Sequence, residues 1–258
     1  MKETKKATFA KYGIEYENGK IFHPEFGFIP LLLVNGNTKL GKGVFTFSTL
    51  PTNKAFTVEI NGKTYTEFGT CACHCVGCYA TKGNYNFSGV KKSLLVKTWL
   101  CRHDLDFVKR AIMAQIESEN IEMLRIHAAG DFFSPEYVEL WREIVKAFPS
   151  CLFWTYTKVD YAEKAFDGFS NANIVKSCIQ GIGFNFGHCN YILRVYEILK
   201  KAGKKVYICR CGIDKNQHCT NCRGCAENEF VLFIEHSTEY NAENDPYFET
   251  LKTVIENQ

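Results

Sequence analysis

The chain has 258 residues and a formal net charge of +3, with basic and acidic residues mixed along its length. Hydrophobic residues make up 46% of it, which is enough for a packed core and excludes a disordered chain. The small net charge does not indicate nucleic-acid binding, which requires a concentrated basic face. The N-terminal segment MKETKKATFAKYG lacks the apolar core of a signal peptide, so we expect a cytoplasmic protein whose thiols stay reduced and are sensitive to oxygen.

The predicted elements begin with short strands at 44–47 and 56–60, followed by an Asn61-Gly62 turn. A strand at 64–68 leads into a cysteine-rich loop, and a helix capped by Asp104 precedes a strand at 123–126. Ser134 and Pro135 begin the next helix, which leads to a strand at 152–156. A short helix at 160–166, a strand at 173–178, a helix through 192–199 and strands at 204–209 and 230–234 complete the chain.

This order predicts the fold class. Strands and helices alternate about every 25 to 30 residues, which is typical of right-handed βα units around a parallel sheet. We expect an α/β protein with a partial (β/α)6 TIM-like barrel over residues 63–208. A small β-rich N-terminal extension would occupy residues 1–62. Residues 209–258 would hold a cysteine-rich cluster region, the last strand and a C-terminal helix. The chemistry of such barrels lies at the C-terminal ends of the strands.

The loop after the strand at 64–68 is the strongest motif. Cys71, Cys75 and Cys78 have C-x3-C-x2-C spacing, so one loop offers three thiolates to one iron-sulfur cluster. Most clusters have four cysteine ligands, and three would leave one iron open for another ligand. A four-thiolate zinc site that includes Cys73 is an alternative, although structural zinc usually takes two separated ligand pairs. A disulfide between positions so close would be strained.

A second cysteine group follows the strand at 204–209. Cys219, Cys222 and Cys225 have C-x2-C-x2-C spacing, which occurs in ferredoxin-type cluster loops. Either Cys209 or Cys211 would be the fourth ligand, and the sequence does not decide between them. The group predicts a second, fully coordinated 4Fe-4S cluster for electron transfer or substrate anchoring. Zinc is the alternative, because a separated fourth ligand is ordinary for structural zinc.

Several motifs together carry a resemblance to a known family. They are Cys75-Val-Gly-Cys78-Tyr79-Ala80, the run from Arg125 to Phe132, Phe153-Trp-Thr-Tyr-Thr-Lys158 and the late cysteines. The cysteine loop and the Gly-acid pair resemble the radical S-adenosylmethionine superfamily. In their order, over about residues 37–236, the motifs resemble more closely the bacteriophage-type "gene product eighty-eight" proteins.

The resemblance implies a cofactor and a reaction. A reduced 4Fe-4S cluster on Cys71, Cys75 and Cys78 would bind S-adenosylmethionine at its open iron and cleave it reductively. The resulting 5'-deoxyadenosyl radical would abstract hydrogen from an unknown substrate. An external electron donor such as flavodoxin or ferredoxin would be needed.

The resemblance also implies cofactor-binding residues. Gly130 and Asp131 stand where the superfamily has a Gly-Gly-Glu segment that binds the cofactor's ammonium group, although aspartate is one methylene shorter. Asp131 could instead cap the helix that begins near Ser134. Ser177 ends the strand from which related enzymes often contact the cofactor ribose.

Other polar residues near strand ends are also candidates. Arg125 and His127 are two residues apart, so on a strand they would share a face and reach toward the cofactor. His127 could equally be a satisfied core histidine. Tyr156 and Lys158 form a similar pair at the end of the third strand.

Two functions of different class follow. The first is a radical S-adenosylmethionine enzyme with an auxiliary cluster and an unknown substrate. The second is a non-catalytic iron-sulfur or zinc-binding phage-type protein that acts on a host partner or on nucleic acid. Formation of 5'-deoxyadenosine distinguishes them.

Overall fold

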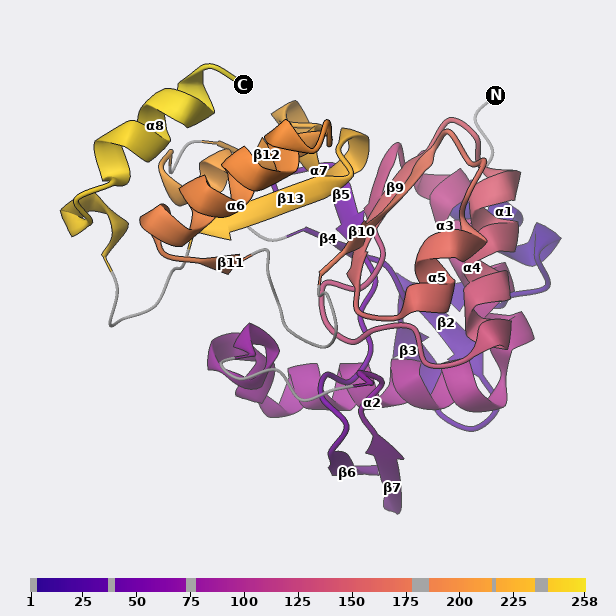
Figure 1. Cartoon of the computed structure of the whole chain (residues 1–258). Coiled ribbons are helices and arrows are strands. Elements are labelled where there is room, and N and C mark those ends of the chain that lie inside the picture. The colour runs from indigo at the N-terminus through magenta and orange to yellow at the C-terminus, as the bar shows by residue number, and fades with distance from the viewer. Residues whose placement is uncertain (1–3, 37–39, 73–77, 178–185, 215–216, 235–240) are drawn as a thin grey trace.

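The computed structural model describes residues 4–36, 40–72, 78–177, 186–214, 217–234 and 241–258, which form a mixed α/β structure with several small sheets (Figure 1). The chain begins with α1 (Lys5–Lys11), whose first turn is capped by the Thr4 hydroxyl. Strands β1 (Tyr16–Glu17), β2 (Lys20–His23) and β3 (Gly27–Pro30) then form a small antiparallel sheet. Helix α1 packs on α3, so this N-terminal part is joined to the main core.

The main sheet has the strand order β10-β9-β8-β5-β4. Its strands are β4 (Val34–Asn35), β5 (Val44–Thr46), β8 (Met123–Arg125), β9 (Leu152–Thr157) and β10 (Ala172–Lys176). Strand β4 pairs antiparallel with β5, and β5, β8, β9 and β10 are all parallel. The carboxyl ends of these four strands therefore meet at one edge.

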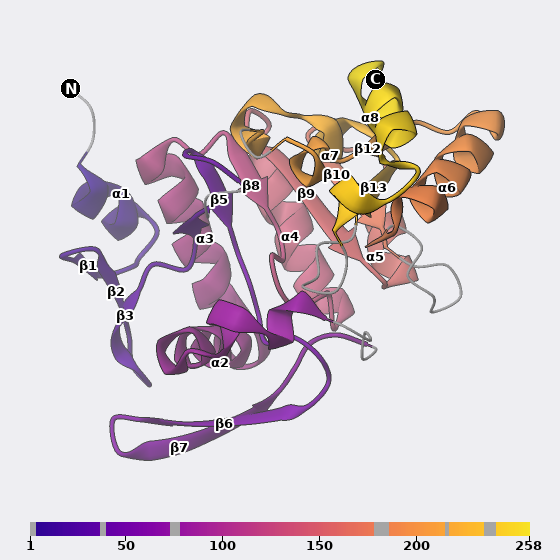
Figure 2. The same ribbon diagram turned by 90° about the vertical axis from the view of Figure 1, so that its left-hand side faces the viewer.

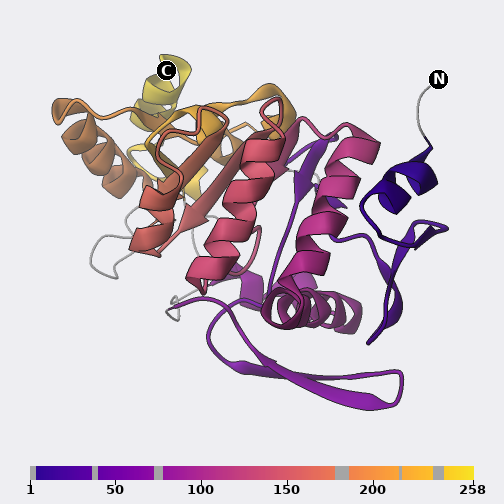
Figure 3. The ribbon, with the colours of Figure 1, turned by 90° about the vertical axis from the view of Figure 1, so that its right-hand side faces the viewer.

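Helices cover one face of this sheet (Figure 3). They are α3 (Leu105–Glu119), α4 (Pro135–Ala147) and α5 (Asp160–Ala165), while α2 (Ser88–His103) lies crosswise below them and packs on α3 (Figure 1). The side chains of Asp104 and Ser134 cap α3 and α4 as predicted. Helix α2 was not among the predicted elements, because lysines interrupt its apolar pattern.

The two faces of the main sheet differ. Leu124, Ile126 and Phe153 pack against the helices in the main core. On the other face Val44 and Trp154 pack with Cys219 and Cys225 from the C-terminal part. This arrangement follows from strand alternation, which sends successive side chains to opposite faces.

The strand that precedes the first cysteines differs from the prediction. Residues 64–68 lie in β7 (Lys63–Phe68), which pairs antiparallel with β6 (Ala55–Ile60) around the Asn61-Gly62 turn. This hairpin extends away from the main sheet (Figure 2). Strand β5, expected in the N-terminal extension, is instead the neighbour of β8 in the parallel sheet.

The C-terminal part has a three-stranded parallel sheet of order β11-β13-β12, made of β11 (Phe186–Gly187), β12 (Val206–Ile208) and β13 (Phe230–Ile234). Helices α6 (Cys189–Lys201) and α8 (Phe248–Glu256) complete its own small core. Short turns of helix connect these elements: η3 (Arg210–Gly212), η4 (Cys219–Asn221), α7 (Gly224–Glu227) and η5 (Ala242–Asn244). Strand pairings cross both boundaries expected between the three parts of the chain. The pairing of β6 with β7 crosses the boundary between residues 62 and 63, and that of β12 with β13 crosses the boundary between residues 208 and 209. Among the described helices, none combines the length and the apolar character needed to cross a membrane.

Candidate functional site

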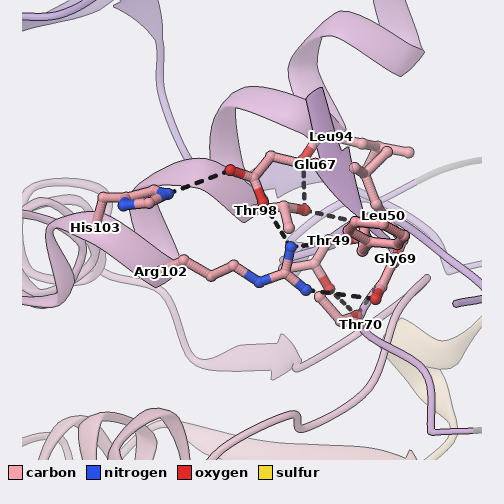
Figure 4. A network of polar contacts seen from close by, with 10 residues as sticks. Thr49, Leu50, Glu67, Gly69, Thr70, Leu94, Thr98, Arg102 and His103 are labelled. Atoms are coloured by element: carbon pink, nitrogen blue, oxygen red, sulfur yellow. Dashed lines mark hydrogen bonds and ion pairs between the residues drawn. The ribbon is translucent and has the colours of Figure 1, made fainter. Parts of the chain in front are cut away.

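The chain that enters the first cysteine segment, residues 71–78, is fixed against α2 (Figure 4). Arg102 donates to Glu67 Oε2 at 2.5 Å and to the carbonyls of Phe68 and Gly69 at 2.8 and 3.4 Å. His103 Nε2 lies 3.3 Å from Glu67 Oε1. Glu67 is buried, and a buried carboxylate is stabilised only when it is paired in this way. Residues 73–77, with Cys75, lie outside the described residues.

Both flanks of the first cysteine segment are bonded to the residues that follow β8. The Asp131 amide donates to Thr70 Oγ1 at 3.0 Å, one residue before Cys71. The Tyr79 hydroxyl, one residue after Cys78, donates to the Ala128 carbonyl. Tyr79 belongs to a short helical turn, η1 (Tyr79–Thr81), which η2 (Gly83–Asn86) follows. The structure thus brings the two flanks of the cysteine motif next to the Gly-Asp motif.

Gly130 makes this close approach possible. Its φ is +86°, and a Cβ there would overlap the Thr49 hydroxyl and lie 2.7 Å from Thr70 Oγ1. The two threonine hydroxyls are hydrogen-bonded to each other at 2.8 Å. Only glycine combines this backbone conformation with this contact.

Asp131 does not cap α4, because Ser134 does so. Its Oδ1 accepts from the Thr157 hydroxyl at 2.6 Å and the Phe132 amide at 2.8 Å, and its Oδ2 accepts from the Lys158 amide at 3.0 Å. Burial raises the pKa of Asp131, and these three hydrogen bonds oppose the rise. Asp131 is a buried carboxylate that forms no ion pair with any described residue.

Lys158 and Ser177 continue this group of residues along the sheet edge. Lys158 Nζ donates to Ser177 Oγ at 3.1 Å, and Ser177 Oγ donates to the Thr157 carbonyl at 3.0 Å. Gly130, Asp131, Lys158 and Ser177 are thus gathered at the carboxyl ends of β8, β9 and β10. These are four of the six cofactor-binding residues predicted from the sequence.

His127 does not share a face with Arg125, so that part of the prediction is wrong. Strand β8 ends at Arg125, and His127 has a left-handed backbone with φ of 58°. Its ring packs among Phe132, Tyr137 and Trp141, and its Nε2 lies 2.8 Å from the Tyr137 hydroxyl. Burial lowers the pKa of His127 to about 3. His127 is placed as a core histidine in contact with α4.

Tyr156, the sixth predicted residue, lies on the opposite face of the sheet with Arg125. The Arg125 guanidinium lies over the Tyr156 ring, 5.2 Å from its centroid, and one of its nitrogens is 3.4 Å from the Tyr79 hydroxyl. Arg125 also acts electrostatically on Cys225, whose thiol contacts Tyr156. Burial raises the pKa of Cys225 to about 11, although Tyr156 and Arg125 oppose the shift. Arg125 therefore lies between Tyr79, which follows the first cysteine segment, and Cys225 of the second.

The thiols of the second cysteine segment, residues 209–225, lie close to one another. Cys211 is within hydrogen-bonding reach of both Cys209 and Cys219, and these contacts are the first cause of their raised pKa values. Cys225 interacts electrostatically with the same thiols. Cys222 differs, since its Sγ lies 3.1 Å from the Tyr207 hydroxyl. The structure therefore includes both Cys209 and Cys211 in the group.

The chemistry of this group fits a thiophilic metal. Clustered thiols hold their protons until a cation replaces them, and the proximity of Arg125 would offset the negative charge of thiolates. As they are arranged here, no three Cys, His, Asp or Glu residues within the described ranges already have metal-binding geometry. Binding of a metal would therefore require the sulfur atoms of Cys209, Cys211, Cys219 and Cys225 to move into coordination geometry.

A cavity of about 360 Å3 adjoins the first cysteine segment. Ala80 and Thr81, just after Cys78, form one side, and Thr52, Lys54 and Lys91 form others. Its size and its two lysines suit a small anionic molecule.

The sequence analysis missed the threonines of this site. Thr49, Thr70 and Thr157 are buried and join the ends of β5, β7 and β9 to residues 129–131. A lone threonine belongs to no motif. For Thr70 and Thr157 the one available signal was their place directly before Cys71 and Lys158, and Thr49 had no such neighbour.

Comparison with known proteins identifies the family. The Gene product 88 family profile matches residues 31–180, more than half of the chain. The chain belongs to the Gene product 88 family. The match includes the first cysteine segment and Ser177 but not the second cysteine segment, so it is shorter than the resemblance over 37–236.

Two curated phage proteins are similar to this chain. The Gene 88 protein of Mycobacterium phage L5 is 32% identical over 95 residues, and that of Mycobacterium phage D29 is 30% identical over 95 residues. Each alignment covers 33% of this chain and 39% of the phage protein, so the chain spans well under half the length of these relatives. No solved structure matches the chain.

Proposed function

We propose that this member of the Gene product 88 family is a radical S-adenosylmethionine enzyme. Cys71, Cys75 and Cys78 would hold a 4Fe-4S cluster with one open iron. When bound, the cluster supplies the electron that cleaves S-adenosylmethionine, and the radical produced takes hydrogen from a substrate. The proposal includes a cytoplasmic location, an external electron donor such as flavodoxin or ferredoxin, and a partial barrel completed around the main sheet.

The observation that carries the proposal is the anchoring of the first cysteine segment. Thr70 and Tyr79, which flank it, are bonded to Asp131 and Ala128 at the end of β8. An open cluster is useful only if its vacant position faces groups that bind the cofactor. Anchoring of both flanks would hold the segment beside Gly130 and Asp131 without using the thiols themselves.

The residues at the sheet edge suit the polar parts of S-adenosylmethionine. Asp131 is a buried carboxylate that forms no ion pair with a described residue, and an ammonium group would offset the cost of burying it. The Ser177 hydroxyl and the Lys158 amine could meet the ribose and the carboxylate. The main sheet and α2 would exclude water from this edge.

The second cysteine segment would hold an auxiliary 4Fe-4S cluster or a zinc ion. Cys209, Cys211, Cys219 and Cys225 would provide four thiolates, with Cys209 and Cys211 both used and the predicted ligand Cys222 left at Tyr207. Every metal position would then be coordinated by protein. Such a centre transfers electrons or stabilises structure and leaves no position for S-adenosylmethionine.

Anaerobic reconstitution with iron and sulfide tests the proposal. The protein is then reduced with dithionite and given S-adenosylmethionine, and 5'-deoxyadenosine is measured by chromatography. We expect product from the wild-type chain and none from Cys75→Ala. Cys73→Ala is the matched control, because it removes a thiol from the same loop but not from the C-x3-C-x2-C set, and it should retain activity.

Two results would contradict the enzyme proposal. One is an iron-loaded protein that makes no 5'-deoxyadenosine. The other is a colourless protein that carries only zinc, which would favour a non-catalytic metal-binding protein acting on a host partner or nucleic acid.

A further inference from the structure

A second cavity, of about 520 Å3, lies in the C-terminal part of the molecule. Its wall is formed by the end of α6, the start of β12, η3 and the segment from η4 to α7. Cys222 of the second cysteine segment also lines it. Its size is that of a small-molecule site.

The charge of this cavity is strongly positive. Four cationic side chains line it, and Glu227 is the one acidic side chain among its described lining residues; the cations are Lys200, Lys205, Arg210 and Arg223. None of the four side chains forms an ion pair with a described carboxylate. Arg210 Nε is buried and has no hydrogen-bond partner among these residues.

The adjacent Lys204 contrasts with the lysines that line the cavity. Lys204, next to Lys205 but outside the cavity, pairs with Glu229 at 3.5 Å. Like charges that converge on a concave surface repel one another, and a bound anion relieves this repulsion. A concave site lined by cations also focuses the field on an anionic ligand.

The other lining groups suit a phosphate ester rather than a simple carboxylate. Arg210 and Arg223 offer planar, forked donors that match phosphate oxygens, and the amides of Asn221 and Asn228 add polar contacts. Tyr196 and Tyr207 provide rings on which a base could stack. Lys200 lies 6.0 Å from the centre of the Tyr196 ring, so it could contact a phosphate beside a stacked base.

We propose that this cavity is a binding site for a pyrophosphate-bearing ligand, of the class of inorganic pyrophosphate and nucleoside polyphosphates. Four cationic side chains against one acidic side chain suit a ligand with two or more phosphates. The Tyr207 hydroxyl, 3.1 Å from Cys222 Sγ, connects the cavity to the second cysteine segment. The site does not depend on a cluster at Cys71, Cys75 and Cys78, so it can be tested separately from the proposed enzyme function.

Isothermal titration of the full chain with sodium pyrophosphate at low ionic strength tests the site. The variant is Lys200→Ala with Lys205→Ala, and the matched control is Lys201→Ala with Lys204→Ala. Both remove two positive charges from the same segments, but only the first pair lines the cavity. We expect the cavity variant to bind pyrophosphate about tenfold or more weakly than wild type, because it loses charge-assisted contacts with the ligand. The control should bind within about twofold of wild type, because the charges that it loses lie outside the cavity and are screened by salt.

Further titrations distinguish the possible sources of the pyrophosphate group. Equal affinity for pyrophosphate and ATP supports a site for the phosphates alone. Tighter ATP binding that Tyr196→Ala reduces supports a nucleotide site. Equal weakening by both double variants, no binding of either ligand, or binding of a single-stranded oligonucleotide alone would overturn the proposal.

Discussion

The two cysteine segments are held in different ways. The flanks of the first are fixed by residues outside it: Thr70 accepts a hydrogen bond from the Asp131 amide, Tyr79 donates to the Ala128 carbonyl, and Arg102 of α2 donates to the Phe68 carbonyl. The second is gathered from within, because Cys211 contacts Cys209 and Cys219, and Cys225 meets Tyr156. Backbone anchoring can set a loop's geometry without a metal, whereas crowded thiols are stable in contact only when protonated or metal-bound.

This difference predicts which changes affect which segment. Substitutions in residues 128–131, which follow β8, should disturb the flanks of the first segment and leave the second intact. Substitution of the second group's thiols should do the reverse. Arg125 contacts Tyr79 on one side and acts on Cys225 on the other, so it is the one described side chain that we expect to affect both.

Gly130→Ala should have the largest effect. A Cβ would overlap Thr49 and crowd Thr70 while the backbone is left-handed, so we expect a loss of about 3 kcal/mol in the free energy of unfolding. Gly168→Ala is the matched control, since Gly168 has a φ of +90° but nothing within 4 Å of a Cβ. It should cost about 1 kcal/mol, measured by urea unfolding. Equal losses would mean that the close approach does not matter.

Cys211→Ala should weaken metal binding at the second segment. We expect Zn2+ affinity to fall by about 100-fold or more, because even an outer partner of a metal ligand is typically worth about 10- to 100-fold. Cys222→Ala is the control, because its thiol is turned toward Tyr207. Competition with a chromophoric chelator measures both. A greater loss for Cys222 would assign it to the ligand set in place of Cys211.

Arg102→Ala should remove part of the anchor of the first segment. The substitution leaves buried Glu67 with His103 as its one described partner and removes the donor to the Phe68 and Gly69 carbonyls. We expect the free energy of unfolding to fall by about 2 kcal/mol. This is less than for a fully buried pair, because Arg102 is partly exposed. Lys109→Ala, which breaks an exposed pair with Glu143, should cost less than about 0.5 kcal/mol. Thermal unfolding compares the two variants, and a similar shift in both would contradict the anchoring role.

His127→Asn should have the smallest effect of these substitutions, and it should appear in how the free energy of unfolding depends on pH. Burial lowers the pKa of His127 from 6.5 to about 3, so between these values the unfolded chain binds a proton that the folded chain does not. The stability contributed by neutral His127 is complete above pH 6.5 and is lost as the pH falls toward 3. Between pH 7 and 5 this loss is at most about 2 kcal/mol.

Asparagine tolerates the left-handed backbone at this position and does not titrate. Urea unfolding at several pH values should therefore show a shallower acid loss in His127→Asn than in wild type. Identical slopes would mean that His127 is not the source of this dependence.

Local signals predicted most elements correctly. The strands expected at 123–126, 152–156 and 230–234 are β8, β9 and β13, and the caps Asp104 and Ser134 are found. Pairing was less predictable. The Asn61-Gly62 turn joins two strands that were assigned to different parts of the chain, although a two-residue turn of this type favours a hairpin. The partial barrel remains a prediction.

The site was predicted in part. Gly130, Asp131, Lys158 and Ser177 do gather at one sheet edge, because parallel strands bring their carboxyl ends together. His127 does not join them, since strand alternation fails once its backbone becomes left-handed. The pyrophosphate cavity had no sequence signal, because its cations come from positions 200, 205, 210 and 223, and a net charge of +3 hides their convergence.

Electron paramagnetic resonance of the reduced, reconstituted protein tests the central claim most directly. The spectrum is recorded with and without S-adenosylmethionine in wild type, in Cys71→Ala with Cys78→Ala, and in Cys211→Ala with Cys219→Ala. We predict that S-adenosylmethionine changes the signal in wild type and in the variant of the second segment, and has no effect when the first segment is removed. A change that persists without Cys71 and Cys78, or no change in iron-loaded wild type, would contradict an open cluster at the first cysteine segment.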